Sequence, residues 1–506
     1  MADYLLSCDI GTSATKASLF SDTGKLIKSV VAPYKIHYSH NSWAEQEPED
    51  WWAAVCETTK ALIQSIPASS IAVISLSGQM SGATFVDSAG KPLRRSIIWL
   101  DNRSTKEVEE LEKKVDRVRH FEQSGRTPNS VRPMEKVMWV KNNEPELYKA
   151  VYKVLQSKDY IAFKLTDNLV TDYTDASATY LLDRKKCIWH QELFETAGLS
   201  IDKFPELAAS TQIIGYVTSG AAARTGLIKG IPVVIGAGDV SASTVGSKCV
   251  QHGQTHISIG SSAWASITLD KPFHDPDRVY SVLHPIPELY VNECCLLTAG
   301  ISYSWLRDEI CTYEKYTAQN QGKNAYDFMD EQVVKSTAGS NGVMFLPYLR
   351  GDMCLHDDPL ATGAFIGLRA ESTRADILRS VIEGVGFYLD LSLKLFASAV
   401  QDMNETILVG GAMKGYVWRE ILCDILGLRC SIPEYLEEAT SLGAAIIGGV
   451  GIGMFKDFSV VDQLISIEQE MEPNVQNHAK YRKMEPVFDQ AYSALKPLYE
   501  GLHAIK

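Results

Sequence analysis

Hydrophobic and polar positions follow two different periods along this chain. Residues 52–66 repeat apolar side chains at helical spacing, and residues 71–76 form a short, continuously apolar run. The first pattern predicts an amphipathic helix, and the second predicts a strand that is buried on both faces. Thr373 precedes another long apolar helical face, at residues 377–389, for which it is a suitable N-cap. The sequence therefore predicts an α/β fold.

Two strand–turn–strand patterns lie roughly half a chain apart. The β-rich run at residues 4–7 leads through Asp9 and a Gly-Thr-Ser turn into a second β-rich run. Residues 256–268 repeat the pattern around Gly260 and Ser261, but no aspartate precedes that turn. Repetition at this spacing predicts a duplicated architecture whose two halves clamp one nucleotide between them.

The Gly-Thr-Ser turn after Asp9 suits phosphate binding. Backbone N–H groups and hydroxyls at such a turn can bind phosphate oxygens, and a carboxylate at the strand end can hold the accompanying metal ion. The alternative is a tight hairpin turn in which Gly11 only supplies permissive backbone geometry. Because only the first pattern includes a carboxylate, we expect the chemistry to lie nearer the N-terminal half.

Length and charge narrow the class of protein. The 506 residues are too many for one ordinary core and fit two domains, for which we predict the ranges 1–247 and 248–506. A polar, glycine-containing stretch at residues 247–254 places the junction. The formal net charge of −13 and the pI near 5.4 argue against nucleic acid or an anionic membrane as partner. We expect small-molecule partners instead.

Targeting and redox signals are few. No basic region precedes an apolar core at the N-terminus, so the sequence predicts no secretory signal and a cytoplasmic location. The apolar stretch at residues 442–455 is shorter than a membrane span and is interrupted by glycines. The ten cysteines include no Cys-x-x-Cys motif, which favours reduced thiols over a zinc site or a disulfide framework.

The apolar run at residues 71–76 leads into a loop that contains Gln79, Met80 and Ser81. Loops at the carboxyl ends of buried strands are where open α/β sheets bind ligands. This loop is therefore a candidate site. The alternative is a glycine-rich turn in which Met80 only fills the core.

Two further apolar runs end at glycines. The run that begins at residue 232 delivers Asp239, which suits a general base at a strand end or, alternatively, a cap for the following helix. Residues 407–409 lead into Gly410 and Gly411. Because glycine has no side chain, a flat base or a ribose can approach this backbone closely, although a tight strand-to-helix turn without a ligand explains the pattern equally well.

Taken in order, these segments resemble the FGGY carbohydrate kinases and, within them, the xylulokinase-like branch. The resemblance covers nearly the whole chain. It rests on Asp9-Ile10-Gly11-Thr12-Ser13 with Thr15-Lys16, Gly78-Gln79-Met80, Trp99 with Asp101 and Arg103, Gly238-Asp239, Gly260-Ser261-Ser262, residues 345–349 with Gly351, Asp358-Pro359, Gly410-Gly411-Ala412, Trp418-Arg419 and Gly443-Ala444-Ala445.

The resemblance implies two actin-like, ribonuclease-H-like domains with ATP and substrate in the cleft between them. It also implies phosphoryl transfer from MgATP to a sugar or polyol hydroxyl, with Asp239 as the general base and Asp9 as the residue that holds Mg²⁺. The implied contacts are Gln79, Met80, Ser81 and Asp239 to the substrate, Gly11, Thr12, Ser13, Lys16, Gly260 and Ser261 to phosphate, and Gly410, Gly411 and Ala412 to the nucleotide.

Two departures from the family pattern concern the substrate region. Xylulokinases usually carry His where this chain has Ser81, and Asn or Gln where it has Val240, so both changes remove a side chain that can hydrogen-bond a ketose. A buried hydroxyl left unpaired costs about 1–3 kcal/mol. Arg126 and Arg132 lie in another departing segment, where they would suit the carboxylate of an aldonate such as gluconate. The alternative is that both are solvated loop residues.

The primary expectation is ATP-dependent phosphorylation of a small sugar, a pentulose such as D-xylulose. The alternatives are a kinase for another polyol or an aldonate, a catalytically silent nucleotide or sugar sensor, and a scaffold protein. The presence of both Asp9 and Asp239 argues against the sensor, which needs no base. A homodimer is compatible with the resemblance.

Overall fold

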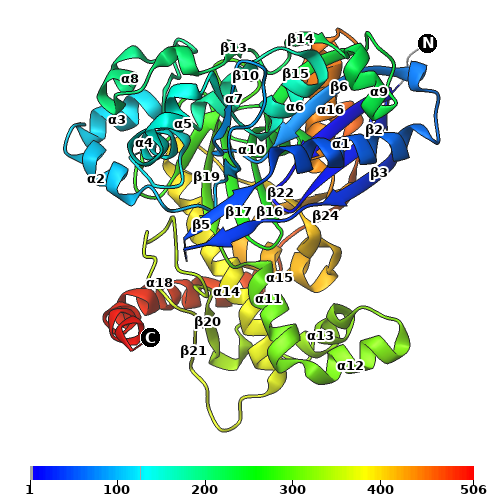
Figure 1. The fold of residues 1–506 in the computed structure, drawn as a ribbon. Coiled ribbons are helices and arrows are strands. Elements are labelled where there is room, and N and C mark those ends of the chain that lie inside the picture. The colour runs from blue at the N-terminus through cyan, green and yellow to red at the C-terminus, as the bar shows by residue number, and fades with distance from the viewer. Residues whose placement is uncertain (1–3, 41, 126, 506) are drawn as a thin grey trace.

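The chain forms two mixed β-sheets with helices packed around them (Figure 1). The computed structural model describes residues 4–40, 42–125 and 127–505. The N-terminal sheet has the order β14 (Ile213–Tyr216), β15 (Pro232–Gly238), β6 (Ile71–Gly78), β1 (Tyr4–Ile10), β2 (Ala14–Ser21) and β3 (Leu26–Pro33). The C-terminal sheet has the order β18 (Tyr280–Leu283), β19 (Tyr290–Leu296), β17 (Ala263–Leu269), β16 (Thr255–Ile259), β22 (Glu405–Val409), β23 (Arg429–Pro433) and β24 (Ile467–Met471).

The two sheets repeat one topology. β1 pairs antiparallel with β2 and parallel with β6, and β6 pairs parallel with β15. In the same way, β16 pairs antiparallel with β17 and parallel with β22, and β22 pairs parallel with β23. An antiparallel strand, β14 or β24, closes each of these series. The structure thus confirms the duplicated α/β architecture that the two glycine-centred patterns predict.

Alternating side chains on β1 pack on two different layers. Leu6, Cys8 and Ile10 contribute to one hydrophobic cluster, whereas Leu5 contributes to another on the opposite face. The first layer is covered by α1 (Pro48–Ile63), α6 (Ser157–Thr166) and α9 (Ser219–Thr225), and the second by α10 (Asp239–Gly246) and α16 (Ala439–Gly451). The N-terminal sheet is therefore buried on both faces, as the continuously apolar run of β6 predicts.

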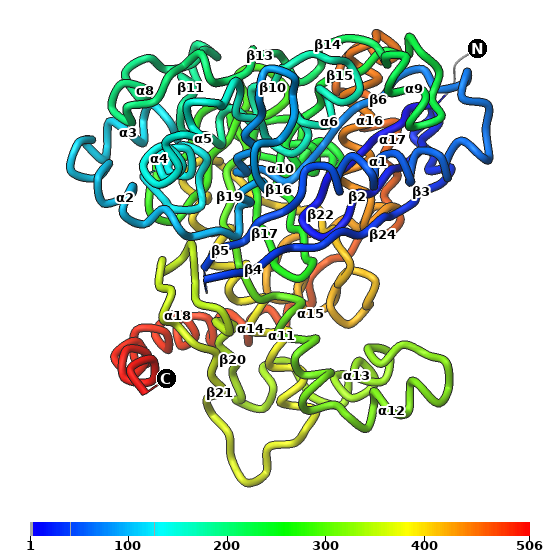
Figure 2. Tube along the Cα trace, viewed as in Figure 1, coloured from blue at the N-terminus to red at the C-terminus, as the bar shows by residue number. Residues whose placement is uncertain are grey.

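Helix α16 comes from late in the sequence and yet packs against β1, β6 and β15. Figures 1 and 2 show this orange segment behind the blue strands. It crosses α10 at glycines: a Cβ on Gly246 would lie 1.8 Å from the Ala439 carbonyl oxygen, and one on Gly443 would lie 1.9 Å from that of Ala242. The glycines of the apolar stretch at residues 442–455 thus allow close helix packing. No described helix is both long and apolar enough to cross a membrane.

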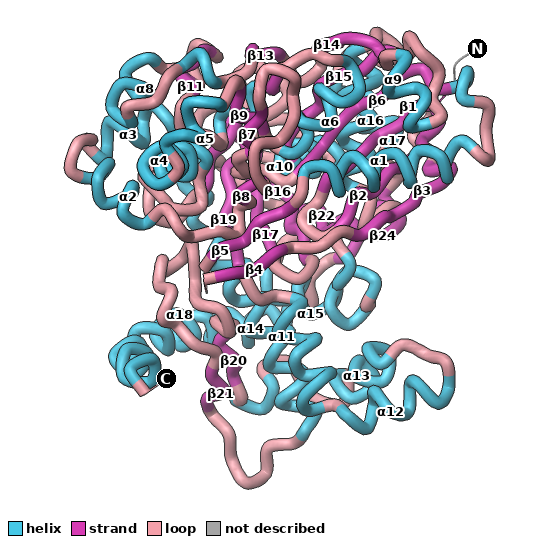
Figure 3. The backbone as a smooth tube through the Cα atoms, viewed as in Figure 1, coloured by secondary structure: helices cyan, strands magenta, loops and turns pink. Residues whose placement is uncertain are grey.

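The C-terminal sheet is covered by the long helix α14 (Arg374–Leu395) and by α15 (Tyr416–Leu426), against which α18 (Val475–Ala504) packs. Thr373 caps α14 in a reciprocal capping box with Asp376, as predicted. Gly427, at φ 65°, ends α15. Figure 3 shows the mostly helical and looped segment that extends below this sheet; it contains α11 (Gly300–Trp305), α12 (Thr312–Gln321), α13 (Ala325–Val333), β20 (Met344–Leu346) and β21 (Ala364–Ile366).

Shorter elements surround the N-terminal sheet and complete the fold. They are β4 (His37–Ser39), β5 (Trp43–Gln46), β7 (Thr84–Val86), β8 (Ser96–Ile97), α2 (Thr105–Glu112), α3 (Arg117–Ser124), α4 (Pro133–Asn143), α5 (Pro145–Ala150), β9 (Lys153–Leu155), β10 (Val170–Asp172), α7 (Tyr173–Ser177), β11 (Leu182–Asp183), β12 (Ile188–Trp189), α8 (Gln191–Ala197) and β13 (Glu206–Ala208). The short helix α17 (Val461–Leu464) precedes β24. All ten cysteines are free thiols.

Candidate active site

The carboxyl ends of three parallel strands bring the predicted polar residues to one sheet edge. Ile10 pairs with Gly78, and Gly78 pairs with Gly238, so β1, β6 and β15 end in register. Neighbouring strands lie about 4.8 Å apart, which places the ends of β1 and β15 about 10 Å from each other. Asp9 and Asp239 are therefore neighbours across β6, although they are 230 positions apart in the sequence.

Asp239 is the first residue of α10 and is half-buried. Gly238, not Asp239, occupies the N-cap position, and the Asp239 Oδ1 accepts a hydrogen bond of 2.8 Å from the Val240 N–H. Burial and, second, the negative charge of Asp9 raise the pKa of Asp239 to about 7. A carboxyl with this pKa can accept a proton near neutral pH, which is the property a general base needs.

A buried network holds the backbone in front of Asp239. The Gly238 N–H donates a 2.9 Å hydrogen bond to Thr174 Oγ1, and this hydroxyl donates one of 2.6 Å to Asp172 Oδ2. Asp172 in turn forms an ion pair of 2.8 Å with the fully buried Lys158. The turn between β15 and α10 is thus fixed to α6 and α7, and the carboxylate of Asp239 starts from a rigid position.

Asp9 presents an oxygen with no protein partner. Its Oδ1 is buried and accepts no hydrogen bond. Burial raises the pKa of Asp9 to about 6, against the opposing positive charge of Lys16. Lys16 pairs with Asp9 across the β1–β2 hairpin, and its Nζ donates a 2.8 Å hydrogen bond to the Glu437 carbonyl, just before α16. This hairpin therefore contacts a segment from the C-terminal part of the sequence.

The carboxylate of Asp9 fits a magnesium ion that is bound together with phosphates. Within the described ranges, no group of three or more His, Cys, Asp or Glu side chains is arranged to hold a metal ion. Mg²⁺ is usually bound in nucleotide sites through one or two carboxylates, several waters and the phosphate oxygens. One unpartnered carboxylate oxygen beside the Gly-Thr-Ser turn is the kind of donor that such a site requires from the protein.

A pocket of about 280 Å³ opens beside Asp239, and we call it the Asp239 pocket. It is walled by both halves of the chain: α10 and the loop after β6 on one side, and strands of the C-terminal sheet on the other. The residues that line it are Thr12, Met80, Ser81, Trp99, Val131, Arg132, Ala178, Asp239, Val240, Ser262, Trp264, Tyr280, Val282, Glu293, Cys295, Leu297 and Met353.

The loop after β6 gives the Asp239 pocket two of its three predicted contacts. Met80 and Ser81 line the pocket, and Ser81 holds a left-handed backbone conformation at φ 63°. Gln79 is buried, and its Nε2 donates a 2.7 Å hydrogen bond to Gln46 Oε1. Gln79 does not line the pocket, so its contact with a substrate stays a prediction.

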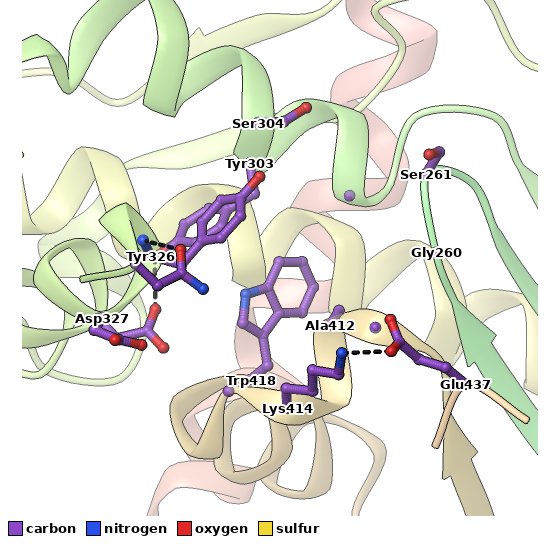
Figure 4. A pocket seen from close by; sticks show the side chains of 15 residues that line it. Gly260, Ser261, Tyr303, Ser304, Tyr326, Asp327, Ala412, Lys414, Trp418 and Glu437 are labelled. Atoms are coloured by element: carbon purple, nitrogen blue, oxygen red, sulfur yellow. Dashed lines mark hydrogen bonds and ion pairs between the residues drawn. The ribbon is translucent and has the colours of Figure 1, made fainter. Parts of the chain in front are cut away.

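A second pocket, of about 420 Å³, lies on the C-terminal sheet, and we call it the aromatic pocket (Figure 4). Tyr303 stacks on Tyr326 with ring centroids 5.6 Å apart, and Trp418 meets Tyr303 edge-on at 5.5 Å. Flat apolar faces of this kind suit a planar ring. The predicted contacts among the lining residues are Gly260, Ser261, Gly411 and Ala412, which lie with Gly300, Ser304, Asn324, Asp327, Asp330, Lys414, Gly415 and Glu437.

The turn between β16 and β17 contributes to both pockets. Ser261 lines the aromatic pocket, and its neighbour Ser262 lines the Asp239 pocket. Gly410 stands behind this turn at φ 98°, where a Cβ would lie 2.4 Å from the Ile259 carbonyl oxygen. The predicted phosphate contacts Gly11, Ser13 and Lys16 line neither pocket; they belong to the facing β1–β2 hairpin, from which Thr12 reaches the Asp239 pocket.

Comparison with known proteins identifies this arrangement. A model of the N-terminal domain of the FGGY family of carbohydrate kinases matches residues 4–246, and a model of its C-terminal domain matches residues 255–452. The chain belongs to the FGGY family of carbohydrate kinases. It is therefore an ATP-dependent kinase of the two-domain, actin-like type, as the sequence resemblance implies. The predicted boundary after residue 247 falls between the two matched ranges and stays a prediction.

Individual FGGY kinases match nearly the whole chain. A xylulose kinase from Staphylococcus epidermidis is 30% identical over 509 residues, with 99% of both chains covered. A gluconokinase from Bacillus licheniformis is 30% identical over 503 residues, with 99% of this chain and 97% of the relative covered. The solved structure of a ligand-bound xylulose kinase from Lactobacillus acidophilus superposes with a TM-score of 0.91 at 26% identity and covers 99% of each chain.

Several residues of this kinase site carried no usable signal in the sequence. Glu293 and Tyr280 come from adjacent strands of the C-terminal sheet, and nothing in their local sequence marks a site. Tyr303 and Tyr326 come from α11 and α13, where one tyrosine among core residues looks like any other. Trp418, by contrast, lies in a segment that resembles the family and was within reach of sequence reasoning.

The two arginines expected near the substrate have different outcomes. Arg132 is 8% exposed and lines the Asp239 pocket, so the solvated-loop interpretation is wrong for it. Arg126 lies outside the described residues.

Proposed function

We propose that this FGGY kinase transfers the γ-phosphoryl group of ATP to a hydroxyl of a small polyhydroxylated substrate bound in the Asp239 pocket. Asp239 takes the hydroxyl proton, and Asp9 holds the magnesium ion of MgATP. The adenosine occupies the aromatic pocket along Gly410, Gly411 and Ala412. The observation that carries the proposal is that the adjacent residues Ser261 and Ser262 line the two pockets, one each, and that the second pocket contains a carboxyl whose pKa is about 7.

The proposed roles divide the work between positioning and charge. Thr12 and Ser13 of the first hairpin and Gly260 and Ser261 of the second present hydroxyls and backbone N–H groups to the phosphates from two sides. Bound Mg²⁺ would neutralise charge on the transferring phosphoryl group. Phosphoryl transfer needs alignment and charge neutralisation more than covalent help, so one base between two phosphate-binding turns is sufficient.

A pentulose such as D-xylulose is the first candidate substrate, because xylulose kinases are similar to this chain over its full length. An aldonate such as gluconate is the second candidate. It is favoured by the basic side chain of Arg132 in the Asp239 pocket and by the similarity to a gluconokinase. We further propose a cytoplasmic location, which suits ten free thiols, and a homodimer, which light scattering on the purified chain tests.

The experiment is ADP release coupled to a spectroscopic assay, with MgATP and a panel of ketopentoses, aldonates, alditols and glycerol. We expect one class to give turnover in the native chain and none in Asp239→Asn. Equal ADP release by both proteins would contradict the assignment of the base. If every compound fails while MgATP still raises the melting temperature, the substrate lies outside this panel or the chain is a sensor.

A further inference from the structure

Arg132 is a buried cation whose hydrogen-bonding groups are only partly satisfied. It occupies the N-cap position of α4, and its side chain lines the Asp239 pocket. Nη1 donates a 2.6 Å hydrogen bond to Ser81 Oγ. Nε is buried and has no hydrogen-bond partner. The residue is 8% exposed, so most of its side chain is shielded from bulk solvent.

Aromatic rings hold the guanidinium of Arg132 in place. Its central carbon lies 4.7 Å from the ring centroid of Tyr280 and 5.3 Å from that of Tyr180. The two tyrosines come from β18 and from the loop after α7, so the group lies between both halves of the chain. Cation–π contacts of this kind fix the plane of the fork, but they leave its positive charge uncancelled.

The acidic groups near Arg132 do not supply the missing charge. No carboxylate of the described ranges forms an ion pair with this guanidinium. Glu293 lines the same pocket and accepts a 2.7 Å hydrogen bond from Ser266 Oγ, and burial raises its pKa to about 8 despite the nearby arginine. Burial likewise raises the pKa of Glu135 to about 8. Neither carboxylate lies within ion-pair distance of the Arg132 guanidinium.

The ammonium group of Lys136, the basic neighbour of Arg132, is already hydrogen-bonded to backbone carbonyls. Lys136, one turn further along α4, donates hydrogen bonds to the carbonyl oxygens of Ser81, Val131 and Ile98. Burial holds the pKa of Lys136 well below its usual range. Among the described residues that line the Asp239 pocket, Arg132 is the one with a cationic side chain. A buried cation without an anionic partner is costly unless a ligand supplies the anion.

We infer that Arg132 binds a carboxylate of the acceptor substrate, which favours the second candidate of the proposed function, a sugar acid of the aldonate class, over the pentulose. The inference rests on the proposed function, because it assumes that the acceptor occupies the Asp239 pocket. A guanidinium fork matches a carboxylate with two parallel hydrogen bonds. Ser81 accepts one N–H of Nη1 and orients the fork, while the Glu293 carboxyl lines the same pocket within reach of a substrate hydroxyl. A neutral ketose would leave the charge of Arg132 unmatched.

The test compares matched acceptors in the native chain and in arginine variants. D-gluconate and pentonates are measured against D-xylulose, D-ribulose and the corresponding alditols. We expect kcat/KM for one aldonate to exceed that of every neutral acceptor by about 100-fold, which is the discrimination expected from two charge-assisted hydrogen bonds. Arg132→Gln should raise KM for the aldonate by about 100-fold. The KM for MgATP should stay constant.

Three companion variants guard against misfolding. Arg132→Lys keeps the charge but loses the fork, so it should recover only part of the aldonate affinity. Ser81→Ala removes the partner of Nη1 from a loop position and should raise KM for the aldonate by several-fold. Arg119→Gln removes an exposed arginine, paired with Glu192, and should change nothing.

Aldonate binding is measured separately by thermal shift in the presence of ADP. A rise in melting temperature with aldonate that is seen in the native chain and lost in Arg132→Gln supports the inference, even if no phosphoryl transfer to the aldonate is detected. Preferred turnover of a neutral ketose that is lost in Asp239→Asn overturns the inference and leaves the proposed function standing. Aldonate turnover that survives Asp239→Asn contradicts the proposed function instead. An equal loss for all acceptors in Arg132→Gln, or no aldonate shift in the native chain, also overturns the inference.

Discussion

The two β-sheets share one topology but present different residues at corresponding strand ends. In the N-terminal sheet, β1 holds Asp9 near its end and β15 leads into Asp239. In the C-terminal sheet, the position of β16 that corresponds to Asp9 is Ser258. β22, the counterpart of β6, leads into Gly410, and β23, the counterpart of β15, leads into Glu434, which is exposed and lines neither pocket. The first copy therefore directs two carboxylates toward the pockets, whereas the second presents small residues there. Under the proposed function, the scaffold is duplicated but the chemistry lies in one copy.

The electrostatic environments of the two copies differ accordingly. Asp9 and Asp239 are close enough for the charge of one to raise the pKa of the other. The facing turn at Gly260 and Ser261 contains no ionisable side chain, and hydrogen bonds from Gly300 and Ile301 of α11 to its carbonyls hold it in place. We expect substitutions in the first copy to affect the rate of transfer and those in the second to affect nucleotide binding.

Asp239→Asn is the sharpest break of this division. An amide cannot take the proton of the acceptor hydroxyl, so kcat should fall by about 10²–10⁴-fold. The KM for MgATP should remain near the native value, because the aromatic pocket lies on the other sheet. Steady-state kinetics with both substrates varied measures this. Asp270→Asn, an exposed position at the end of β17, is the matched control and should retain native activity. A raised KM for MgATP with native kcat would show that the two copies do not divide the work.

Asp9→Asn should be the next largest effect. It replaces the buried, unpartnered carboxylate oxygen with a neutral group, and metal ions contribute several kcal/mol to such reactions, so we expect a loss of about 100-fold at low Mg²⁺. The activity should recover partly as the Mg²⁺ concentration rises. The counterpart in the other copy, Ser258→Ala, should leave the Mg²⁺ titration unchanged. If Asp9→Asn and the native chain gave the same Mg²⁺ titration, Asp9 would not be the residue that holds the metal ion.

Most of the fold followed from local pattern. The period change between α1 and β6, the cap at Thr373 and the glycine after α15 each depend on a few neighbouring residues, and the structure confirms them. The two Gly-Ser/Thr turns predicted two similar sheets, because a repeated motif can be recognised in the sequence without knowing any tertiary contact. The packing of α16 on the N-terminal sheet was not predictable, since its apolar stretch is compatible with any buried surface.

The site followed less completely. Strand-end residues such as Asp9, Met80 and Asp239 were predictable, because the carboxyl edge of a parallel sheet is a fixed place in the fold. Tyr303 and Glu293 were not, because the residues that complete a pocket from the opposite sheet are selected by tertiary distance. Arg132 is the clearest example of what the sequence could not predict. A charged residue in a loop is expected to be exposed, and only the structure shows that this one is buried.

Gly410→Ala tests the second copy. The residue has φ 98°, and a Cβ there would lie 2.4 Å from a backbone carbonyl oxygen, so the substitution should cost about 1–3 kcal/mol in strain. We expect a lower melting temperature and a KM for MgATP raised about tenfold, the equivalent of 1.4 kcal/mol. In the first copy, Gly78→Ala meets a movable serine hydroxyl at 2.7 Å and should leave the KM for MgATP unchanged. Equal effects on nucleotide binding would contradict the proposed division.

The pH profile measures the coupling between the two carboxylates. The base must be deprotonated, so kcat/KM should rise with pH through the Asp239 pKa of about 7 and fall about tenfold for each pH unit below it. Since the charge of Asp9 raises this pKa, Asp9→Asn should move the midpoint to lower pH. Rate measurements from pH 5.5 to 8.5 on both proteins test the sign. A midpoint that stays fixed, or moves upward, would show that the carboxylates are not coupled.

Substitution of Lys16 should have the smallest effect on activity. It tests whether this side chain binds phosphate or only links the first hairpin to the segment before α16. Its Nζ donates to the Glu437 carbonyl, which adjoins the aromatic pocket, and lies 3.9 Å from a Glu438 carboxylate oxygen. If the ammonium also turns to the phosphates of bound ATP, as predicted, Lys16→Met should raise the KM for MgATP about fivefold, the value of one hydrogen bond of about 1 kcal/mol. Glu438→Gln keeps the carbonyl contact and should leave that KM unchanged. If both variants lower the melting temperature and neither alters nucleotide affinity, Lys16 only fastens the first hairpin to the segment before α16, and phosphate binding rests on the two turns alone.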